Sequence, residues 1–254
     1  MKIAVLGAGA MGSLFGGYLS RENEVTVIDL AKPIVEAINK DGVRIKEKDG
    51  NVTLCHPHAV TDASNIETQD LVIVFVKAMY SVSALETNKN LIGKNTYLMT
   101  LQNGAGHESK LLKFADRLHV IIGSTQHNSS VIEPGFVNHG GSGMSSIGLL
   151  DGNSDVLKPI AQSFTACGLE CHTENNVQKQ IWKKMFTNTA ASSLTALFQV
   201  PLGFIHTDKN ANWIMRQLCH EAVTVANALG LDFNEEKVVG DVETVLINAP
   251  NGYT

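Results

Sequence analysis

Three glycines near the amino terminus have the spacing of a dinucleotide-binding turn, in the segment Gly7-Ala8-Gly9-Ala10-Met11-Gly12. The segment follows an apolar run, residues 3–6, and opens a helical pattern, which is the context that this motif requires. The first glycine permits a tight turn, the second lets the backbone approach a pyrophosphate, and the third lets the helix pack closely on the strand. Free N–H groups at the helix start would bind the anion. We therefore predict that the cofactor is bound by Gly7, Gly9, Ala10, Met11 and Gly12.

An acidic residue stands where the adenine ribose of such a cofactor would lie. Asp29 ends the run Val25-Thr26-Val27-Ile28 and lies 17 residues (29 − 12) after Gly12, close to the expected spacing of about 20 residues. A carboxylate there accepts hydrogen bonds from the ribose hydroxyls and repels a 2′-phosphate. Asp29 therefore predicts NAD as the cofactor, and Lys32 is expected to be solvated rather than to bind a phosphate.

Four polar residues recur every fourth position in the second half of the chain: Gln180, Lys184, Asn188 and Ser192. In a helix this spacing places them along one face. Asparagine and serine are poor residues for a helix interior, so the stripe needs a reason. A substrate cleft is one reason and a solvated face is the other, and the spacing alone leaves both open. Reduction of a 2-oxo acid would require such groups, namely a proton donor at the ketone oxygen and a donor for the carboxylate.

The first 170 or so residues alternate apolar runs with helical patterns, which predicts a doubly wound α/β sheet. The predicted strands are Lys2–Leu6, Glu24–Asp29, Asp70–Val76, Thr96–Leu101, Val120–Ser124 and a short one near Leu169–Thr173. The predicted helices are Ala10–Ser20, Pro33–Asp41, Ser81–Leu91 and Glu108–Phe114. Val43–Leu54 reads as a hairpin, and Gly135–Gly148 is expected to hold another antiparallel pair at the sheet edge.

From Asn175 onward the pattern is helical. We predict helices over Val177–Leu197 and Lys209–Leu229, separated by a break at Pro201-Leu202-Gly203, and a third helix beginning near Asn234. The expected fold is thus a Rossmann-type doubly wound sheet followed by a smaller all-α domain. We place the dinucleotide-binding domain at residues 1–173 and a helical substrate or catalytic domain at residues 174–254.

Composition excludes several classes of protein. A net charge of −5 and a pI of about 6.0 argue against a nucleic-acid partner, which normally requires a basic face. The longest apolar run, Leu71–Val76, is far shorter than the roughly 20 residues of a membrane span, and no signal peptide is apparent. We therefore expect a cytoplasmic protein without a membrane partner.

Neither the cysteines nor the histidines show a metal-binding pattern, so no metal is predicted and the thiols are expected to be reduced. His127, which follows the predicted strand Val120–Ser124, is expected to be a structural or rim histidine.

Four separated motifs resemble the ketopantoate reductase (2-dehydropantoate 2-reductase) family, which includes D-2-hydroxyacid dehydrogenases of the D-mandelate type. The motifs occur in order between residue 1 and about residue 205: the glycine-rich turn, Phe75-Val76-Lys77-Ala78, Gln102-Asn103-Gly104, and the Trp182-Lys183-Lys184 helix with Asn188. The resemblance implies that Lys184 is the catalytic lysine, whose ammonium polarises and protonates the ketone oxygen. It also implies that Asn188 holds the substrate, that Asn103 lies between cofactor and substrate as a further catalytic residue, and that Lys77 lines the cofactor cleft.

The chain departs from the family pattern at three places. Asp29 replaces the arginine that accompanies NADP, Ser192 replaces a second substrate-binding asparagine, and we expect the family's C-terminal substrate-binding segment to be absent. These departures favour an NAD-dependent D-2-hydroxyacid dehydrogenase that reduces a branched or aromatic 2-oxo acid. The alternatives are a 2-dehydropantoate 2-reductase with an unusual coenzyme and a non-catalytic NAD-binding sensor. The substrate side chain, the physiological direction and the oligomeric state, a homodimer included, stay open.

Overall fold

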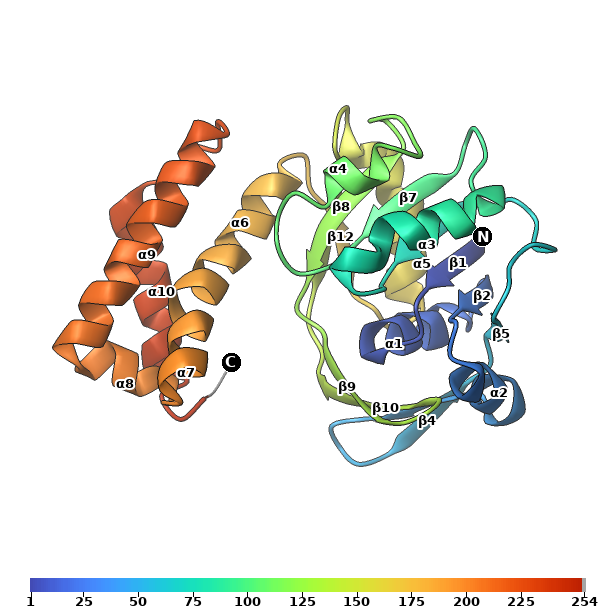
Figure 1. Ribbon diagram of the computed structural model, residues 1–254, viewed down its shortest axis with the longest axis horizontal. Helices are drawn as coiled ribbons and strands as arrows, with labels where there is room; N and C mark the ends of the chain where they lie inside the picture. Colours follow the sequence, from blue (N-terminus) through green and yellow to red (C-terminus); the bar gives the residue numbers. More distant parts are fainter. Residues whose placement is uncertain (253–254) are drawn as a thin grey trace. The chain divides into compact units, whose positions relative to one another are not determined.

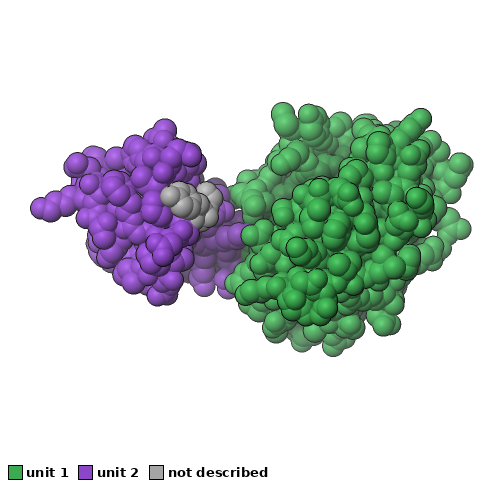
Figure 2. Space-filling view, turned by 90° about the horizontal axis from the view of Figure 1, so that it is seen from below, with its two compact units in different colours: residues 1–177 green, residues 178–254 purple. Residues whose placement is uncertain are grey.

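The computed structural model describes residues 1–252, and the chain divides into two units, residues 1–177 and 178–254 (Figure 2). Sequence reasoning placed the division slightly earlier, before residue 174. Parallel strands dominate the first unit, and helices make up the second (Figure 1). The fold class is therefore the one that the alternation of apolar runs predicted.

The larger sheet of the first unit has the strand order β12-β11-β8-β7-β6-β1-β2-β5. Its strands are β1 (Lys2–Leu6), β2 (Glu24–Ile28), β5 (His58–Val60), β6 (Leu71–Val74), β7 (Tyr97–Thr100), β8 (Val120–Thr125), β11 (Ser145–Leu149) and β12 (Cys171–Thr173). Neighbours pair in parallel except β8 and β11. Every residue of β6 is buried, as expected for a central strand covered on both faces. The strand order reverses between β1 and β6, and ligands of such sheets bind beyond the carboxyl ends of the strands at that point.

Short helices connect these strands: α1 (Ala10–Leu19), α2 (Lys32–Asp41), α3 (Ser81–Thr87), α4 (Glu108–Leu111) and α5 (Lys158–Ala166). The predicted helix over 81–91 ends earlier and continues as a 3₁₀ turn, Lys89–Leu91, and the one over 108–114 is a single turn. Helix α5 was missed. Its start has proline at the first turn and its buried residues, Ile160, Ala161 and Phe164, keep helical spacing.

A second sheet, with the order β4-β3-β10-β9, packs against α1 (Figure 1). Its strands are β3 (Val43–Lys46), β4 (Val52–Cys55), β9 (Asn128–Glu133) and β10 (Phe136–Gly141). The predicted hairpin over 43–54 is confirmed by the antiparallel pair β3–β4. The antiparallel pair predicted within 135–148 is wrong, because β10 pairs with β9 across a turn at Gly135 whereas β11 joins β8 in the larger sheet. All five residues of β11 are buried, which suits a strand with neighbours on both sides.

The second unit consists of α6 (Val177–Thr187), a π-helical turn (Asn188–Ser192), α7 (Ser193–Phe198), α8 (Leu202–Thr207), α9 (Lys209–Ala228) and α10 (Glu235–Asn248). The helix predicted over 177–197 is therefore helical throughout, but its middle is wider than an α-helix. The Asp208 carboxylate accepts hydrogen bonds from two first-turn amides of α9, and the Asn234 side-chain oxygen accepts one from the Lys237 amide of α10. Buried side chains of these helices form a core of their own, which includes Trp182 and Phe186.

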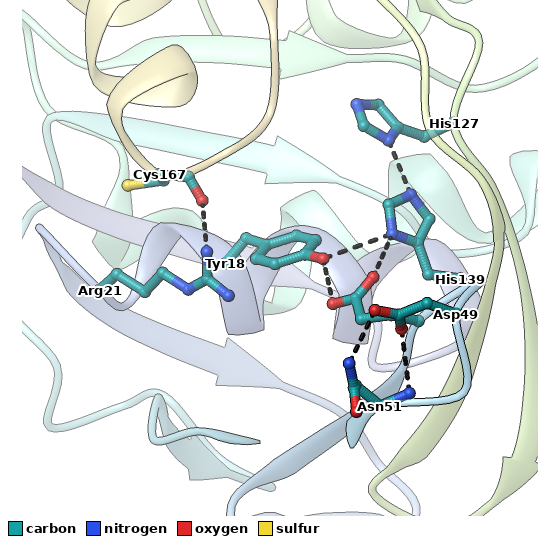
Figure 3. A network of polar contacts seen from close by, with 8 residues as sticks. Tyr18, Arg21, Asp49, Asn51, His127, His139 and Cys167 are labelled. Carbon is teal, nitrogen blue, oxygen red and sulfur yellow. Dashed lines mark hydrogen bonds and ion pairs between the residues drawn. The ribbon is translucent and has the colours of Figure 1, made fainter. Parts of the chain in front are cut away.

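A buried polar network joins the second sheet to α1 (Figure 3). The Tyr18 hydroxyl of α1 donates to one carboxylate oxygen of Glu47 at 2.5 Å, and the other oxygen lies 3.0 Å from Nδ1 of His139 on β10. Nε2 of His139 in turn lies 3.0 Å from Nδ1 of His127. His127 is buried against Phe15 and is a structural histidine, not one at the rim.

The charge on Glu47 determines which atom donates in its contact with His139. Burial raises the pKa of the Glu47 carboxyl, but the hydrogen bonds from Tyr18 and His139 outweigh burial and leave that pKa below its ordinary value. An ionised Glu47 accepts a hydrogen bond from Nδ1–H of His139. Within residues 1–252, Nε2 of the buried His127 has no hydrogen-bond partner.

Burial, and then the adjacent His139, lower the pKa of His127 below its ordinary value of 6.5, with a smaller opposing contribution from Glu170. The folded protein therefore binds a proton at His127 less readily than the unfolded chain. The stability that neutral His127 contributes is fully present above about pH 6.5 and is lost as the pH falls below it.

We predict that the free energy of unfolding decreases between about pH 7 and pH 5, and that His127→Gln flattens this decrease because glutamine does not titrate. Urea denaturation of both proteins across this range measures the effect. His58→Gln, at an exposed histidine of the edge strand, serves as the control. Equal slopes for the wild type and His127→Gln would contradict the assignment.

Candidate functional site

The glycine-rich turn lies at the carboxyl end of β1, beside the switch point of the sheet. Gly7 has φ +99°, and a Cβ there would lie 2.9 Å from the Val76 nitrogen. A Cβ at Gly12 would lie 1.8 Å from the Gly7 carbonyl oxygen, which no side chain allows. At Gly9, by contrast, a Cβ would meet no atom within 4 Å. The first and third glycines are therefore required by packing, whereas the second faces open space from which a ligand can approach the backbone.

The start of α1 has no side-chain cap. Gly9 is the N-cap residue, and the first turn contains no acidic residue. The Ser13 hydroxyl donates to the Ala8 carbonyl at 2.9 Å, and no side chain caps the first-turn amides. Amides at a helix start bind anions such as the phosphates of a nucleotide.

Both carboxylate oxygens of Asp29 accept hydrogen bonds from the backbone. Oδ2 lies 2.7 Å from the Ala8 amide nitrogen and Oδ1 lies 2.9 Å from that of Ala31. The carboxylate thus ties the end of β2 to the glycine-rich turn. It is only partly buried, and its remaining lone pairs leave room for hydroxyl donors. Asp29 therefore has a structural contact in addition to the ribose contact that its position predicts.

Asp29 also lines a pocket of about 280 Å³ in the first unit. Its walls come from the ends of β1 and β2, the segment after β6, and α3: Leu6, Gly7, Ile28, Asp29, Leu30, Val76, Tyr80, Ser83, Ala84, Thr87 and Asn88. None of these residues carries a positive charge. Lys32 is exposed and does not line the pocket. An apolar pocket with one carboxylate at its rim suits an adenosine without a 2′-phosphate.

Sequence reasoning missed the wall that α3 and the preceding turn contribute. A signal was present, since Tyr80, Ala84 and Asn88 recur every fourth residue after the strand β6. A helical segment that begins at the carboxyl end of a central strand must present one face to the switch point.

The two loops that carry Lys77 and Asn103 are adjacent. Gln102, after β7, donates through Nε2 to the Val76 carbonyl, and its Oε1 accepts from the Thr100 hydroxyl at 3.0 Å. The Asn103 carbonyl lies 2.9 Å from Nε2 of His107, which is buried. Lys77 and the Asn103 side chain are exposed at the same edge of the sheet as the glycine-rich turn.

The remaining site residues lie in the second unit. Lys184 is half-buried on α6, between the buried rings of Trp182 and Phe186 in sequence, and burial lowers the pKa of its ammonium. Asn188 begins the π-helical turn and Ser192 ends it. Such turns shift the side chains that follow relative to a regular helix and are frequent at functional sites. The even four-residue spacing therefore holds from Gln180 to Asn188 but does not describe the position of Ser192.

Within residues 1–252, no group of three histidine, cysteine or acidic side chains is placed to hold a metal ion. All four cysteines are free and buried. No helix in the same range is long and apolar enough to traverse a bilayer.

Comparisons with known proteins agree with this architecture. The family described as ketopantoate reductase PanE/ApbA matches residues 3–152, and the C-terminal domain of that family matches residues 176–254. A 2-dehydropantoate 2-reductase from Halobacterium salinarum is 30% identical over 94% of this chain and 79% of its own length.

Two solved structures are similar over the whole chain or nearly so. The ternary structure of D-mandelate dehydrogenase with NADH and anilino(oxo)acetate has a TM-score of 0.88 and 29% identity, covering 97% of this chain and 80% of its own. A 2-dehydropantoate 2-reductase from Geobacter metallireducens GS-15 has a TM-score of 0.89 and 27% identity, covering 100% of this chain and 85% of its own.

The glycine geometry makes a paired prediction. Gly9→Ala should keep the stability of the wild type within about 0.5 kcal/mol, because its methyl group meets no atom, but should weaken NADH binding about tenfold or more. Gly12→Ala should lose about 3 kcal/mol of stability, because its methyl group collides with the Gly7 carbonyl. Thermal denaturation and fluorescence titration with NADH measure both. A Gly9→Ala variant that binds NADH like the wild type would rule out backbone contact at this turn.

Proposed function

Because this chain belongs to the ketopantoate reductase family, we propose that it is an NAD-dependent oxidoreductase that reduces a 2-oxo acid to a D-2-hydroxy acid. The observation that carries the coenzyme preference is the Asp29 carboxylate at the rim of a pocket without cationic residues. The similarity to D-mandelate dehydrogenase structures that hold NADH supports the same preference.

The described residues fit a bound NADH. Gly9 leaves space for the pyrophosphate at an uncapped helix start, and among the described residues that line the neighbouring pocket Asp29 alone is charged. A 2′-phosphate at that position would face the carboxylate with no lysine or arginine in the pocket wall to offset the repulsion. When bound, NADH supplies a hydride, which is transferred to C2 of the 2-oxo acid.

In this proposal Lys184 supplies the proton. As C2 receives the hydride, the ketone oxygen gains the electron pair of the C=O bond and takes a proton from the Lys184 ammonium. The products are NAD⁺ and the hydroxy acid, and the neutral amine regains its proton from water. Burial lowers the pKa of Lys184, so its ammonium is a stronger acid than that of an exposed lysine.

Four other polar residues, two in each unit, have supporting roles in the proposal. Asn188, at the beginning of the π-helical turn, donates to the substrate carboxylate. Ser192, at the other end of that turn, belongs to the same substrate-binding segment. Asn103 and Lys77, on adjacent loops at the coenzyme edge, hold the nicotinamide end of the coenzyme and the substrate. We assign the substrate a branched or aromatic side chain, because Ser192 is a shorter polar anchor than asparagine.

A second candidate is 2-dehydropantoate reduction, because curated relatives of this chain carry the name 2-dehydropantoate 2-reductase. The chemistry at the ketone is the same, so only the substrate distinguishes the two candidates.

An assay that combines three 2-oxo acids with two coenzymes tests both. We predict that turnover with phenylglyoxylate or 3-methyl-2-oxobutanoate exceeds turnover with ketopantoate, and that kcat/KM with NADPH is at least about tenfold below that with NADH, a difference of about 1.4 kcal/mol. Asp29→Asn removes the charge but keeps the size of the side chain. It should reduce the ratio of kcat/KM with NADH to kcat/KM with NADPH. Preference for ketopantoate would favour the second candidate, and preference for NADPH would contradict the role of Asp29.

A further inference from the structure

The segment after β6 is held by hydrogen bonds on both sides of Lys77. The Val76 carbonyl accepts a hydrogen bond from Gln102, and the Ala78 carbonyl accepts one from Nζ of Lys110 at 2.8 Å. The donors come from the segment after β7, Gln102 at its beginning and Lys110 within α4. The backbone that carries Lys77 is therefore fixed by side chains of the neighbouring loop.

Packing does little to hold this segment. The residues Ala78–Tyr80 form a 3₁₀ turn in which no residue is buried, and Met79 is 78% exposed. Where apolar burial is small, hydrogen bonds decide the position of the backbone. The bond from Lys110 is the stronger kind, since an ammonium donor makes a charge-assisted hydrogen bond.

We propose that Lys110 is a positioning residue, which places Lys77 in the coenzyme cleft by holding the Ala78 carbonyl. Lys110 belongs to none of the motifs that identify the site, and it acts through the backbone rather than by touching the coenzyme. The inference rests on the proposed function only in assigning Lys77 to the coenzyme cleft.

A double-mutant cycle on NADH affinity tests the proposal. The dissociation constant is measured by fluorescence titration for the wild type, Lys77→Ala, Lys110→Met and the double variant. Methionine keeps the length and apolar stem of lysine but cannot donate. We expect Lys110→Met to weaken NADH binding about fivefold, Lys77→Ala to weaken it at least as much, and the double variant to bind no more weakly than Lys77→Ala alone, because the two residues act through one contact.

Two further variants separate positioning from general stabilisation. Lys110→Arg retains a charged donor and should bind NADH within about twofold of the wild type. Lys113→Met removes an exposed lysine three residues further on and should leave the affinity unchanged. Should Lys110→Met fail to fold, Lys110→Gln replaces it in the cycle. We expect Lys110→Gln to bind NADH more weakly than Lys110→Arg does.

Additive losses in the cycle, or an unchanged affinity in either single variant, would overturn the proposal. A wild-type protein that binds NADH with the expected coupling but reduces no 2-oxo acid would contradict the proposed function and leave the role of Lys110 standing. A wild type that binds no NADH would contradict both.

Discussion

The close contact between the start of α1 and the Gly7 carbonyl determines the geometry of the coenzyme half. With no Cβ at Gly12, the helix begins directly against the end of β1, and Gly7 lies against Val76, two residues beyond the end of β6. The Asp29 carboxylate then bonds the Ala8 amide of the same turn. Three parallel strands therefore bring their carboxyl ends together around one short segment of backbone, and the pocket beside Asp29 exists because no side chain fills that space.

Features set by neighbouring residues were predictable from the sequence. The apolar run of β6, the glycine turn and the starts of α9 and α10 each depend on a few consecutive residues. The partition of residues 135–149 between two sheets was not predictable, because it depends on which distant strands, β9 and β8, pair with β10 and β11. The network of Tyr18, Glu47 and His139 likewise joins residues far apart in the sequence.

The candidate site also has features that the sequence predicts and features that only the structure reveals. The predicted roles of Asp29 and the glycines follow from spacing, and those proposed for Lys184 and Asn188 follow from family resemblance together with their helical register. The hydrogen bonds that Gln102 and Lys110 donate to the segment around Lys77 end on backbone carbonyls, so no partner side chain in that segment indicates them in the sequence. The π-helical turn at 188–192 gave no signal either, because α and π turns accept the same residue types.

Turnover of the variant Lys184→Ala tests the central claim most directly, with NADH saturating and a 2-oxo acid that the wild type reduces. The account predicts a kcat at least about 10²-fold below wild type, the usual contribution of a positioned acid, with NADH affinity within about threefold and near-normal turnover by Lys183→Ala. Lys183→Ala removes a positive charge at the adjacent exposed lysine, so it controls for the loss of charge in Lys184→Ala. A Lys184→Ala variant with nearly full activity would show that the proton comes from another group.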